Sequence, residues 1–272
     1  MVERSPLRYG RGSVRGLTNS HVRRLHARSH CRVRPDVRFS VVIPARNEER
    51  YIGRCLESIR IAAKPYPGQV EVIVVLNRCC DQTEEIAHAF GARTIREDAR
   101  NLARIRNVGA GAATGSVLMT VDADSTVTPN MFSAIDHALT RGNTVGGGTW
   151  IVPERFSLGI VASLLMLLPF FLRNPISGGL FWCYLRDFQA IGGFDENFVA
   201  AEDVDFARRL KAYGKKVGRP FSTLRGAHIV TSCRKFDQFG DWCLVRNPGL
   251  VRRLVGGKCQ KSADLIYYDV ER

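Results

Sequence analysis

Short apolar runs alternate with amphipathic stretches through the first half of the chain. Residues 39–43, 70–76 and 116–121 are rich in aliphatic side chains, a pattern typical of strands that are buried on both faces. After the first run, apolar residues such as Ile52 and Leu56 recur at helical spacing. The same pattern predicts a helix that begins near Glu48 with Asn47 as its cap, helices over residues 83–90 and 101–114, and a short strand over residues 92–97.

Strands and helices that alternate with short connections predict a parallel, doubly wound α/β sheet with right-handed crossovers. Ligands of such sheets bind at the carboxyl ends of the strands. Three polar segments follow the predicted strands at that edge, namely ARNEE (residues 45–49), NRCCDQT (77–83) and DADS (122–125). We therefore expect these three loops to converge on one binding site.

The second half of the chain carries a different pattern. We expect a helix over residues 131–139, and a strand over residues 149–153 that follows the glycines at 146–148. Residues 156–172 contain no charged side chain and would form a helix of about 25 Å, short of the ~30 Å hydrocarbon core of a bilayer. The pattern therefore favours an interfacial or acceptor-facing helix, or a core helix, over a membrane span.

Positive charge is concentrated at the N-terminus. The chain of 272 residues has a net charge of +14, and its first 38 residues contribute +8 through ten arginines. Residues 1–37 lack a periodic apolar pattern, so we expect a disordered basic tail. An arginine-rich arm can bind nucleic acid or an anionic membrane surface, but the scarcity of aromatic residues argues against nucleic acid.

The eight cysteines form no CxxC pair and have no spacing typical of a zinc site. The N-terminal segment also has no apolar stretch of the kind found in secretory signals. Both observations predict reduced thiols and a cytoplasmic protein.

Two aspartates stand one residue apart, just after a predicted buried strand. Asp122 and Asp124 can face the same polar crevice, and carboxylate oxygens suit Mg²⁺ or Mn²⁺. A metal held by one or two carboxylates usually shares its remaining positions with substrate phosphates. The alternative is a simple turn, because aspartate is common at the ends of strands.

A second acidic pair, Glu202 and Asp203, stands where a helix is predicted to begin. Phe206 and Leu210 follow at the spacing of a buried helical face. Acidic residues at a helix N-terminus can act simply as caps. In a partly enclosed pocket, however, a carboxylate whose pKa is tuned by its neighbours can act as a general base towards a hydroxyl group.

Six motifs occur in an order and spacing that resemble the inverting glycosyltransferases of family 2, in particular small single-domain bacterial members: IPARNEE, LNRCCDQT, RNVGAGAATG, DADS, GGFDE and EDVDF. The resemblance covers about residues 38 to 235. It implies the GT-A fold, which is Rossmann-like, with helices flanking a mostly parallel central sheet. It also implies a hexosyltransferase-type enzyme with a nucleotide-diphosphate-sugar donor, a divalent metal (Mg²⁺ or Mn²⁺) and inversion at the anomeric carbon.

The resemblance divides the chain into functional segments. Residues 38–128 would form the nucleotide-sugar half and residues 129–235 the acceptor half of one domain. Residues 236–272 would form a C-terminal extension packed on that domain.

The resemblance also assigns roles to individual residues. Asp203 would be the base, with Glu202 beside it, and Asp124 and Asp122 would hold the metal. His228 is a further candidate for the metal or a phosphate, although a lone histidine is more often structural. The residues assigned to the donor are Pro44, Ala45, Arg46, Glu48, Asn77, Asp81, Arg106 and Asp122. Those assigned to the acceptor are Gly178, Gly179 and Trp182.

Three positions depart from the family pattern. Leu76 stands where several members carry an aspartate associated with base recognition, so Asn77 becomes the candidate base contact. Arg46 stands where an aromatic residue is common. The QxxRW motif of processive synthases is incomplete because Asp241 occupies its arginine position. The sequence therefore favours transfer of a single sugar over synthesis of an extruded chain.

Two other functions stay open at this point. A nucleotidyltransferase can share a sheet of this type and an acidic metal site, but the first loop, IPARNEE, lacks the glycines usual in that class. A non-catalytic nucleotide-sugar-binding module would need no base such as Asp203. The acceptor is a glycan, a lipid-linked molecule or a small molecule. The apolar segment 156–172 favours an acceptor near a membrane and peripheral contact at its inner face.

Overall fold

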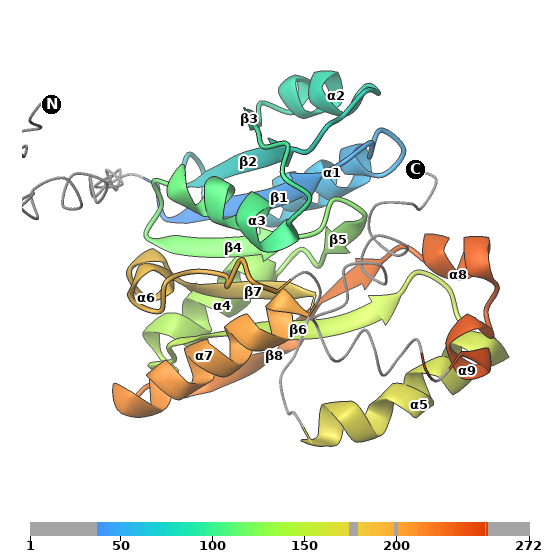
Figure 1. Cartoon of the computed structure of the whole chain (residues 1–272). Helices are drawn as coiled ribbons and strands as arrows, with labels where there is room; N and C mark the ends of the chain where they lie inside the picture. Colours follow the sequence, from blue (N-terminus) through green and yellow to red (C-terminus); the bar gives the residue numbers. More distant parts are fainter. Residues whose placement is uncertain (1–36, 174–178, 199–200, 248, 250–272) are drawn as a thin grey trace, which may run out of the picture. The chain divides into compact units, whose positions relative to one another are not determined.

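The computed structural model describes residues 37–173, 179–198, 201–247 and 249 (Figure 1). All of these residues belong to one unit, which spans residues 31–272. The basic tail predicted over residues 1–37 lies outside the described residues except for Val37. The C-terminal extension predicted over residues 236–272 is described only as far as residue 249, apart from residue 248.

Strands and helices alternate along the described chain. The strands are β1 (Phe39–Ala45), β2 (Val70–Leu76), β3 (Arg93–Arg96), β4 (Val117–Val121), β5 (Ser125–Val127), β6 (Gly146–Pro153), β7 (Leu180–Tyr184) and β8 (Phe221–Thr231). The helices are α1 (Ile52–Ala62), α2 (Thr83–Ala89), α3 (Leu102–Gly111), α4 (Met131–Thr140), α5 (Leu158–Arg173), α6 (Leu185–Ala190), α7 (Glu202–Lys216), α8 (Arg234–Phe239) and α9 (Cys243–Arg246).

Within the described residues, the strands form one eight-stranded sheet in the order β3-β2-β1-β4-β7-β6-β8-β5. Strands β1 to β4 are parallel, as the alternation of strands and helices predicted. Beyond β4 the sheet is mixed: β7 is antiparallel to β4 and β6, β8 is parallel to β6, and β5 is antiparallel to β8. The predicted α/β class is confirmed, and its parallel part is the half that carries the three polar loops.

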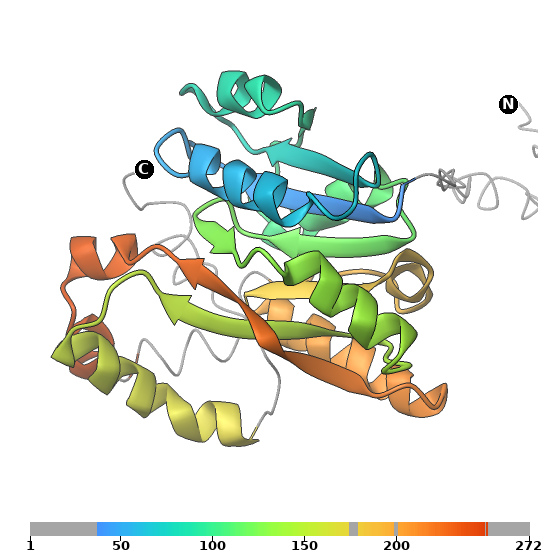
Figure 2. The ribbon, with the colours of Figure 1, turned by 180° about the vertical axis from the view of Figure 1, so that it is seen from behind.

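Helices cover both faces of the sheet. Figure 1 shows the face covered by α3, α6 and α7, where Ile105, Phe188 and Phe206 belong to one hydrophobic cluster. Figure 2 shows the opposite face with α1 and α4, whose Ile59 and Phe132 belong to a second cluster. The strands buried between these layers are aliphatic on both sides, which explains their continuous apolar runs.

The first helix begins later than predicted. It starts at Ile52 rather than near Glu48, and Asn47 does not cap it. Asn47 has a left-handed backbone (φ 51°), and its Oδ1 accepts a hydrogen bond from the Cys80 N–H at 2.9 Å. The asparagine therefore joins the loop after β1 to the loop after β2, which corrects its predicted role.

Close packing of strands explains a second correction. The glycines at 146–148 lie inside β6 instead of preceding it. A Cβ at Gly147 would lie 1.7 Å from the Ser222 carbonyl oxygen on β8, so the approach of the two strands requires glycine there. Local propensity penalises glycine in a strand, which is why the sequence pattern placed the strand after these residues.

No helix in the described part of the chain is long and apolar enough to cross a membrane. Helix α5 buries Ile160 and Ser163 and lies beside α9 (Figure 1). Its other face is apolar and open to solvent: Leu158 is 82% exposed and Leu165 is 62% exposed. Because so much of this face is exposed, α5 is not the core helix that the sequence left open.

Candidate functional site

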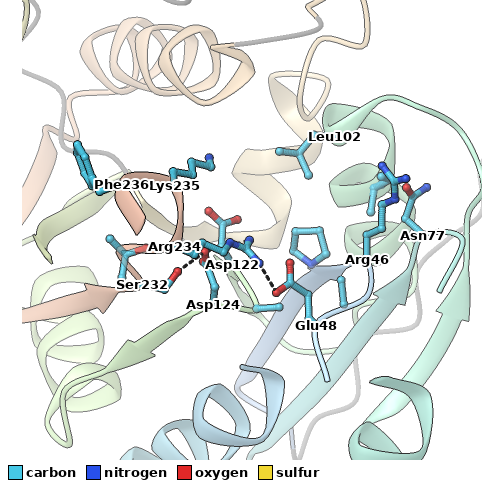
Figure 3. A pocket seen from close by; sticks show the side chains of 15 residues that line it. Arg46, Glu48, Asn77, Leu102, Asp122, Asp124, Ser232, Arg234, Lys235 and Phe236 are labelled. Atoms are coloured by element: carbon cyan, nitrogen blue, oxygen red, sulfur yellow. Dashed lines mark hydrogen bonds and ion pairs between the residues drawn. The ribbon is translucent and has the colours of Figure 1, made fainter. Parts of the chain in front are cut away.

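The three polar loops meet at the carboxyl ends of β1, β2 and β4, as predicted. A pocket of about 260 Å³ lies there (Figure 3). The segment that follows β8 completes its wall, which the sequence did not predict. The residues that line it are Pro44, Ala45, Arg46, Glu48, Asn77, Leu102, Ile105, Asp122, Ala123, Asp124, Thr231, Ser232, Arg234, Lys235 and Phe236.

Hydrogen bonds between the loop after β1 and the loop after β2 fix the wall of the pocket that these two loops form. The Glu48 N–H donates to Thr83 Oγ1 at 2.7 Å, and the Glu49 N–H donates to Asp81 Oδ2 at 3.0 Å. Asp81 Oδ1 also accepts from the Thr83 hydroxyl at 2.6 Å. Asp81, predicted to bind the donor, therefore joins the loops in the structure and does not line the described pocket.

Asn77 reaches the pocket from the end of β2. Its backbone N–H donates to the Ala45 carbonyl at 2.8 Å. Its side-chain amide donates to the carbonyls of Glu97 and Ala99 at 2.6 and 2.9 Å, which ties the chain after β3 to this loop. Because both amide protons are engaged, Asn77 Oδ1 is the side-chain atom that can accept a hydrogen bond from a ligand. Arg78 also donates to this oxygen at 3.5 Å.

Arg106 on α3 links the two acidic motifs. Its guanidinium pairs with Asp122 Oδ1 at 2.8 Å and with Glu202 Oε1 at 2.5 Å. Burial lowers the pKa of Arg106, but the carboxylates of Asp122 and Glu202 outweigh it and hold the pKa above its usual value. The arginine is therefore a fixed cation that joins the carboxyl end of β4 to the start of α7.

Glu202 and Asp203 begin α7, as predicted, and Phe206 and Leu210 are buried beneath them. Burial raises the pKa of both carboxyl groups, and the charge of Arg106 offsets only part of the effect. Asp203 Oδ1 accepts from the Val204 N–H at 2.7 Å. Asp203 thus lies beside Glu202 in a half-buried position, without lining the described pocket itself.

Arg234, at the start of α8, makes the matching link on the other side of the pocket. Its Nη1 pairs with Glu48 Oε2 at 2.7 Å and its Nη2 with Asp124 Oδ2 at 3.0 Å (Figure 3). The Ser232 hydroxyl donates to the same Asp124 oxygen at 2.9 Å. Each aspartate of the DAD motif is therefore held by one arginine, Asp122 by Arg106 and Asp124 by Arg234.

Arg234, Lys235 and Ser232 were not predicted as site residues. Arg234 contacts Glu48, which is 186 positions away in the sequence. The signal that could have found it is the basic pair in SCRKF (residues 232–236), directly after the strand that contains His228. That signal is weak, because short basic pairs are common on exposed surfaces.

The residues assigned to the acceptor occupy different environments. Trp182 is fully buried in the sheet, and its indole N–H donates to the Gly148 carbonyl at 3.4 Å, so its visible role is packing. Gly179 has φ +77°, and a Cβ there would lie 2.6 Å from Ile151, so glycine is required. Gly178 lies outside the described residues.

His228 lies within β8, where its backbone N–H donates to Thr128 Oγ1 at 3.3 Å. It is not among the described residues that line the pocket. Ser232 and Arg234, further along the chain, are the residues that reach Asp124 from this segment. The structure therefore brings the segment to the site at positions after His228.

The donor set of the pocket fits a metal that is shared with a ligand. Among the described residues, no three histidine, cysteine, aspartate or glutamate side chains gather to hold a metal ion. Asp122 and Asp124 supply hard carboxylate oxygens at the pocket wall, and the Asp122 side chain is 44% exposed. Mg²⁺ and Mn²⁺ accept such ligands when phosphate oxygens and water complete the coordination.

Comparison with models of known protein families shows to which family the chain belongs. The model of "Glycosyl transferase family 2" matches residues 40–180, and that described as "N-terminal domain of galactosyltransferase" matches residues 172–232. The protein belongs to glycosyltransferase family 2. The matched region of the first model includes all three polar loops and the DAD motif.

A curated relative covers only part of this glycosyltransferase-family chain. The "Putative glycosyltransferase EpsH" of Bacillus subtilis (strain 168) is 28% identical over 96 residues. The match covers 34% of this chain and 27% of EpsH. The chain therefore matches only about a quarter of the length of EpsH.

Solved structures share the fold at low sequence identity. S. aureus TarS 1–349 with UDP-GlcNAc has a TM-score of 0.57 at 17% identity, covering 72% of this chain and 58% of TarS. The mannosyltransferase PcManGT from Pyrobaculum calidifontis, with GDP-Man and Mn²⁺, has a TM-score of 0.55 at 20% identity, covering 71% and 56%. Glucosyl-3-phosphoglycerate synthase from Mycobacterium tuberculosis, with Mn²⁺ and UDP, has a TM-score of 0.52 at 19% identity, covering 79% and 80%. The predicted GT-A fold is confirmed.

Proposed function

We propose that this family 2 protein is an inverting glycosyltransferase that moves one sugar from a nucleotide-diphosphate-sugar to an acceptor hydroxyl. The observation that carries the proposal is the DAD motif at the end of β4, where each aspartate is paired with a different arginine inside one pocket. Carboxylates and fixed cations that alternate in this way suit a diphosphate and its metal. Proteins of the same fold have been crystallised with UDP-GlcNAc and GDP-Man.

The donor lies in the pocket of Figure 3. Pro44, Ala45 and Arg46 form the wall after β1 and Asn77 the wall after β2. The nucleotide base of the donor contacts Asn77 Oδ1, because the amide protons of that side chain are already engaged. Asp81 supports this wall through its bond to the Glu49 N–H.

Asp124 and Asp122 would hold the divalent metal, which would share its remaining coordination positions with the diphosphate. When bound, Mg²⁺ or Mn²⁺ supplies positive charge that stabilises the departing nucleoside diphosphate. Arg106 adds a fixed positive charge beside Asp122, where it is already paired and needs no reorganisation. His228 stays a secondary candidate for the metal or a phosphate.

Asp203 acts as the base. Burial raises the pKa of its carboxyl group, which makes the carboxylate a better proton acceptor at neutral pH. It removes the proton of the acceptor hydroxyl as that oxygen attacks the anomeric carbon on the face opposite the diphosphate. Attack on that face inverts the configuration. Gly178, Gly179 and Trp182 stay assigned to the acceptor half, with Trp182 acting through packing.

Replacement of Asp124 by alanine tests the donor site. We expect the affinity for UDP or GDP, measured by calorimetry with Mn²⁺, to fall at least about tenfold, since even indirect supports of metal ligands contribute 10–100-fold. Glu57→Ala is the control, because it removes one negative charge from an exposed pair with Arg60. Equal affinities in the wild type and Asp124→Ala would remove Asp124 from the site. Absence of nucleoside diphosphate binding in the wild type would contradict the function itself.

The exposed face of α5 supports contact with a lipid surface near the acceptor. Phe156, Leu158 and Leu165 are 65%, 82% and 62% exposed, and Trp150 on β6 is 62% exposed. A patch of this kind would be costly to leave in water, and it suits insertion between lipid headgroups. We place the protein at the cytoplasmic face of a membrane, with a lipid-linked acceptor favoured over a free glycan or small molecule.

Two negative charges introduced on the exposed face of α5 test the proposed membrane contact. Leu158→Glu combined with Leu165→Glu should lower partition into vesicles of phosphatidylglycerol and phosphatidylcholine at least about tenfold, because each leucine contributes ~1.5–3 kcal/mol when buried. Phe90→Glu and Val217→Glu place the same charge on residues exposed to 41% and 42% outside α5. Equal co-sedimentation of the α5 variant and the wild type with the vesicles would contradict the proposed membrane contact.

A further inference from the structure

Arg234 forms an ion pair with Asp124, the carboxylate that is proposed to hold the metal. Its guanidinium bridges Asp124 and Glu48, at 3.0 and 2.7 Å, and lies over the Tyr51 ring with its Cζ 5.3 Å from the ring centroid. Figure 3 shows Arg234 among the residues that line the pocket, next to Glu48 and Asp124. The side chains of Arg234 and Asp124 are only 14% and 12% exposed. A cation that arrives from solution therefore meets Asp124 already neutralised by an internal one.

The bridge is built so that it can be released. Arg234 begins α8, a short helix with no fully buried residue. Its Nε is buried without a hydrogen-bond partner in the described part of the protein. A guanidinium with one unsatisfied donor gains a full set of bonds when a bidentate anion replaces one of its carboxylate partners. Since Arg234 also lines the pocket, a diphosphate would lie within its reach.

We propose that Arg234 is a donor-responsive positioning residue: it pairs with Asp124 and Glu48 before the donor binds and moves onto the diphosphate when the donor binds. The proposal rests on the proposed function and adds a residue that the family resemblance did not assign. Guanidinium groups bind phosphates in a bidentate way, so the exchange keeps the arginine paired. Asp124 is released for a divalent cation by the same movement, so diphosphate and cation bind cooperatively.

The cooperativity makes opposite predictions for two ligands. In Arg234→Gln, Asp124 is no longer occupied by an arginine, so Mn²⁺ alone should bind about tenfold more tightly than to the wild type. The same variant lacks a phosphate contact, so UDP or GDP in the presence of Mn²⁺ should bind about tenfold more weakly. A variant that had merely lost structure would not gain affinity for Mn²⁺.

The experiment measures Mn²⁺ by electron paramagnetic resonance and the nucleoside diphosphate by calorimetry. Arg60→Gln is the matched control, because it removes the same charge from an exposed pair with Glu57, and both affinities should match the wild type. Arg234→Lys keeps the charge but loses the two-pronged geometry. It should fall between the wild type and Arg234→Gln in both measurements, and it serves in place of the glutamine variant where the latter does not fold.

Each outcome is decisive. Tighter Mn²⁺ binding together with weaker diphosphate binding supports the role of Arg234. Unchanged or weaker Mn²⁺ binding overturns it, and so does an unchanged affinity for the diphosphate. The failure of the proposed function looks different, because then the wild type itself binds neither UDP nor GDP.

Discussion

Asp203→Asn is expected to slow sugar transfer about a thousandfold, a loss within the range usual for a general base. Asparagine keeps the size of the side chain but cannot accept the proton of the acceptor hydroxyl. Donor binding should change by less than about twofold, because Asp203 does not line the described donor pocket. Initial rates with saturating donor, together with calorimetry of the donor, separate these two effects.

Asp205→Asn provides the control for this substitution. Asp205 stands two positions further along α7 and pairs with Arg209 at 2.6 Å, on the same helix as Asp203. Its loss should leave the transfer rate within about twofold of the wild type, since a partly exposed ion pair between neighbouring turns of one helix contributes little. Normal turnover by Asp203→Asn, or equal loss in both variants, would show that Asp203 is not the base.

Arg106→Gln is expected to lower the free energy of unfolding by about 3–5 kcal/mol, the usual cost of breaking a buried ion pair from one side. The reason is that Glu202, whose side chain is 4% exposed, loses its counter-ion inside the protein. Urea unfolding followed by fluorescence or circular dichroism measures the loss. Transfer should fall as well, because the link between Asp122 and the start of α7 is gone.

A double-mutant cycle with Glu202→Gln tests the physical reason. Two neutral amides leave no uncompensated charge in the interior, so Arg106→Gln combined with Glu202→Gln should be more stable than the sum of the two single losses predicts. A difference of at least about 1 kcal/mol is expected for side chains in direct contact. Strict additivity would mean that the Arg106–Glu202 pair does not account for the stability of this region.

Much of the parallel half of the fold could be read from the sequence. Its strands are buried on both faces, and burial leaves a continuous aliphatic signal that periodicity detects directly. The mixed half was harder, because β6 and β8 approach so closely that Gly147 is needed inside a strand. Glycine has a low strand propensity, so the residue that this packing requires is one that local patterns exclude.

The candidate site was predictable where it follows the ends of the parallel strands. Asp122, Asp124 and Asn77 reach the pocket because topology places these ends at one edge. Asp81 and Asn47 were harder to place, since their polar side chains turned out to join loops to each other. Arg234 gave only a weak signal, because its partner Glu48 is remote in sequence and only the folded sheet brings them together.

The most direct test of the account is a thermal-unfolding scan of the wild type with UDP-, GDP- and dTDP-sugars in the presence of Mn²⁺. A donor at about 100 times its dissociation constant adds ~2.7 kcal/mol of stability, which corresponds to a rise of roughly 5–10 °C in Tm for a domain of this size. The account predicts such a rise with the sugars of at least one of these nucleotides, and its loss in Asp124→Ala. No rise with any of them would contradict the claim that the loops after β1, β2 and β4 form a nucleotide-sugar site.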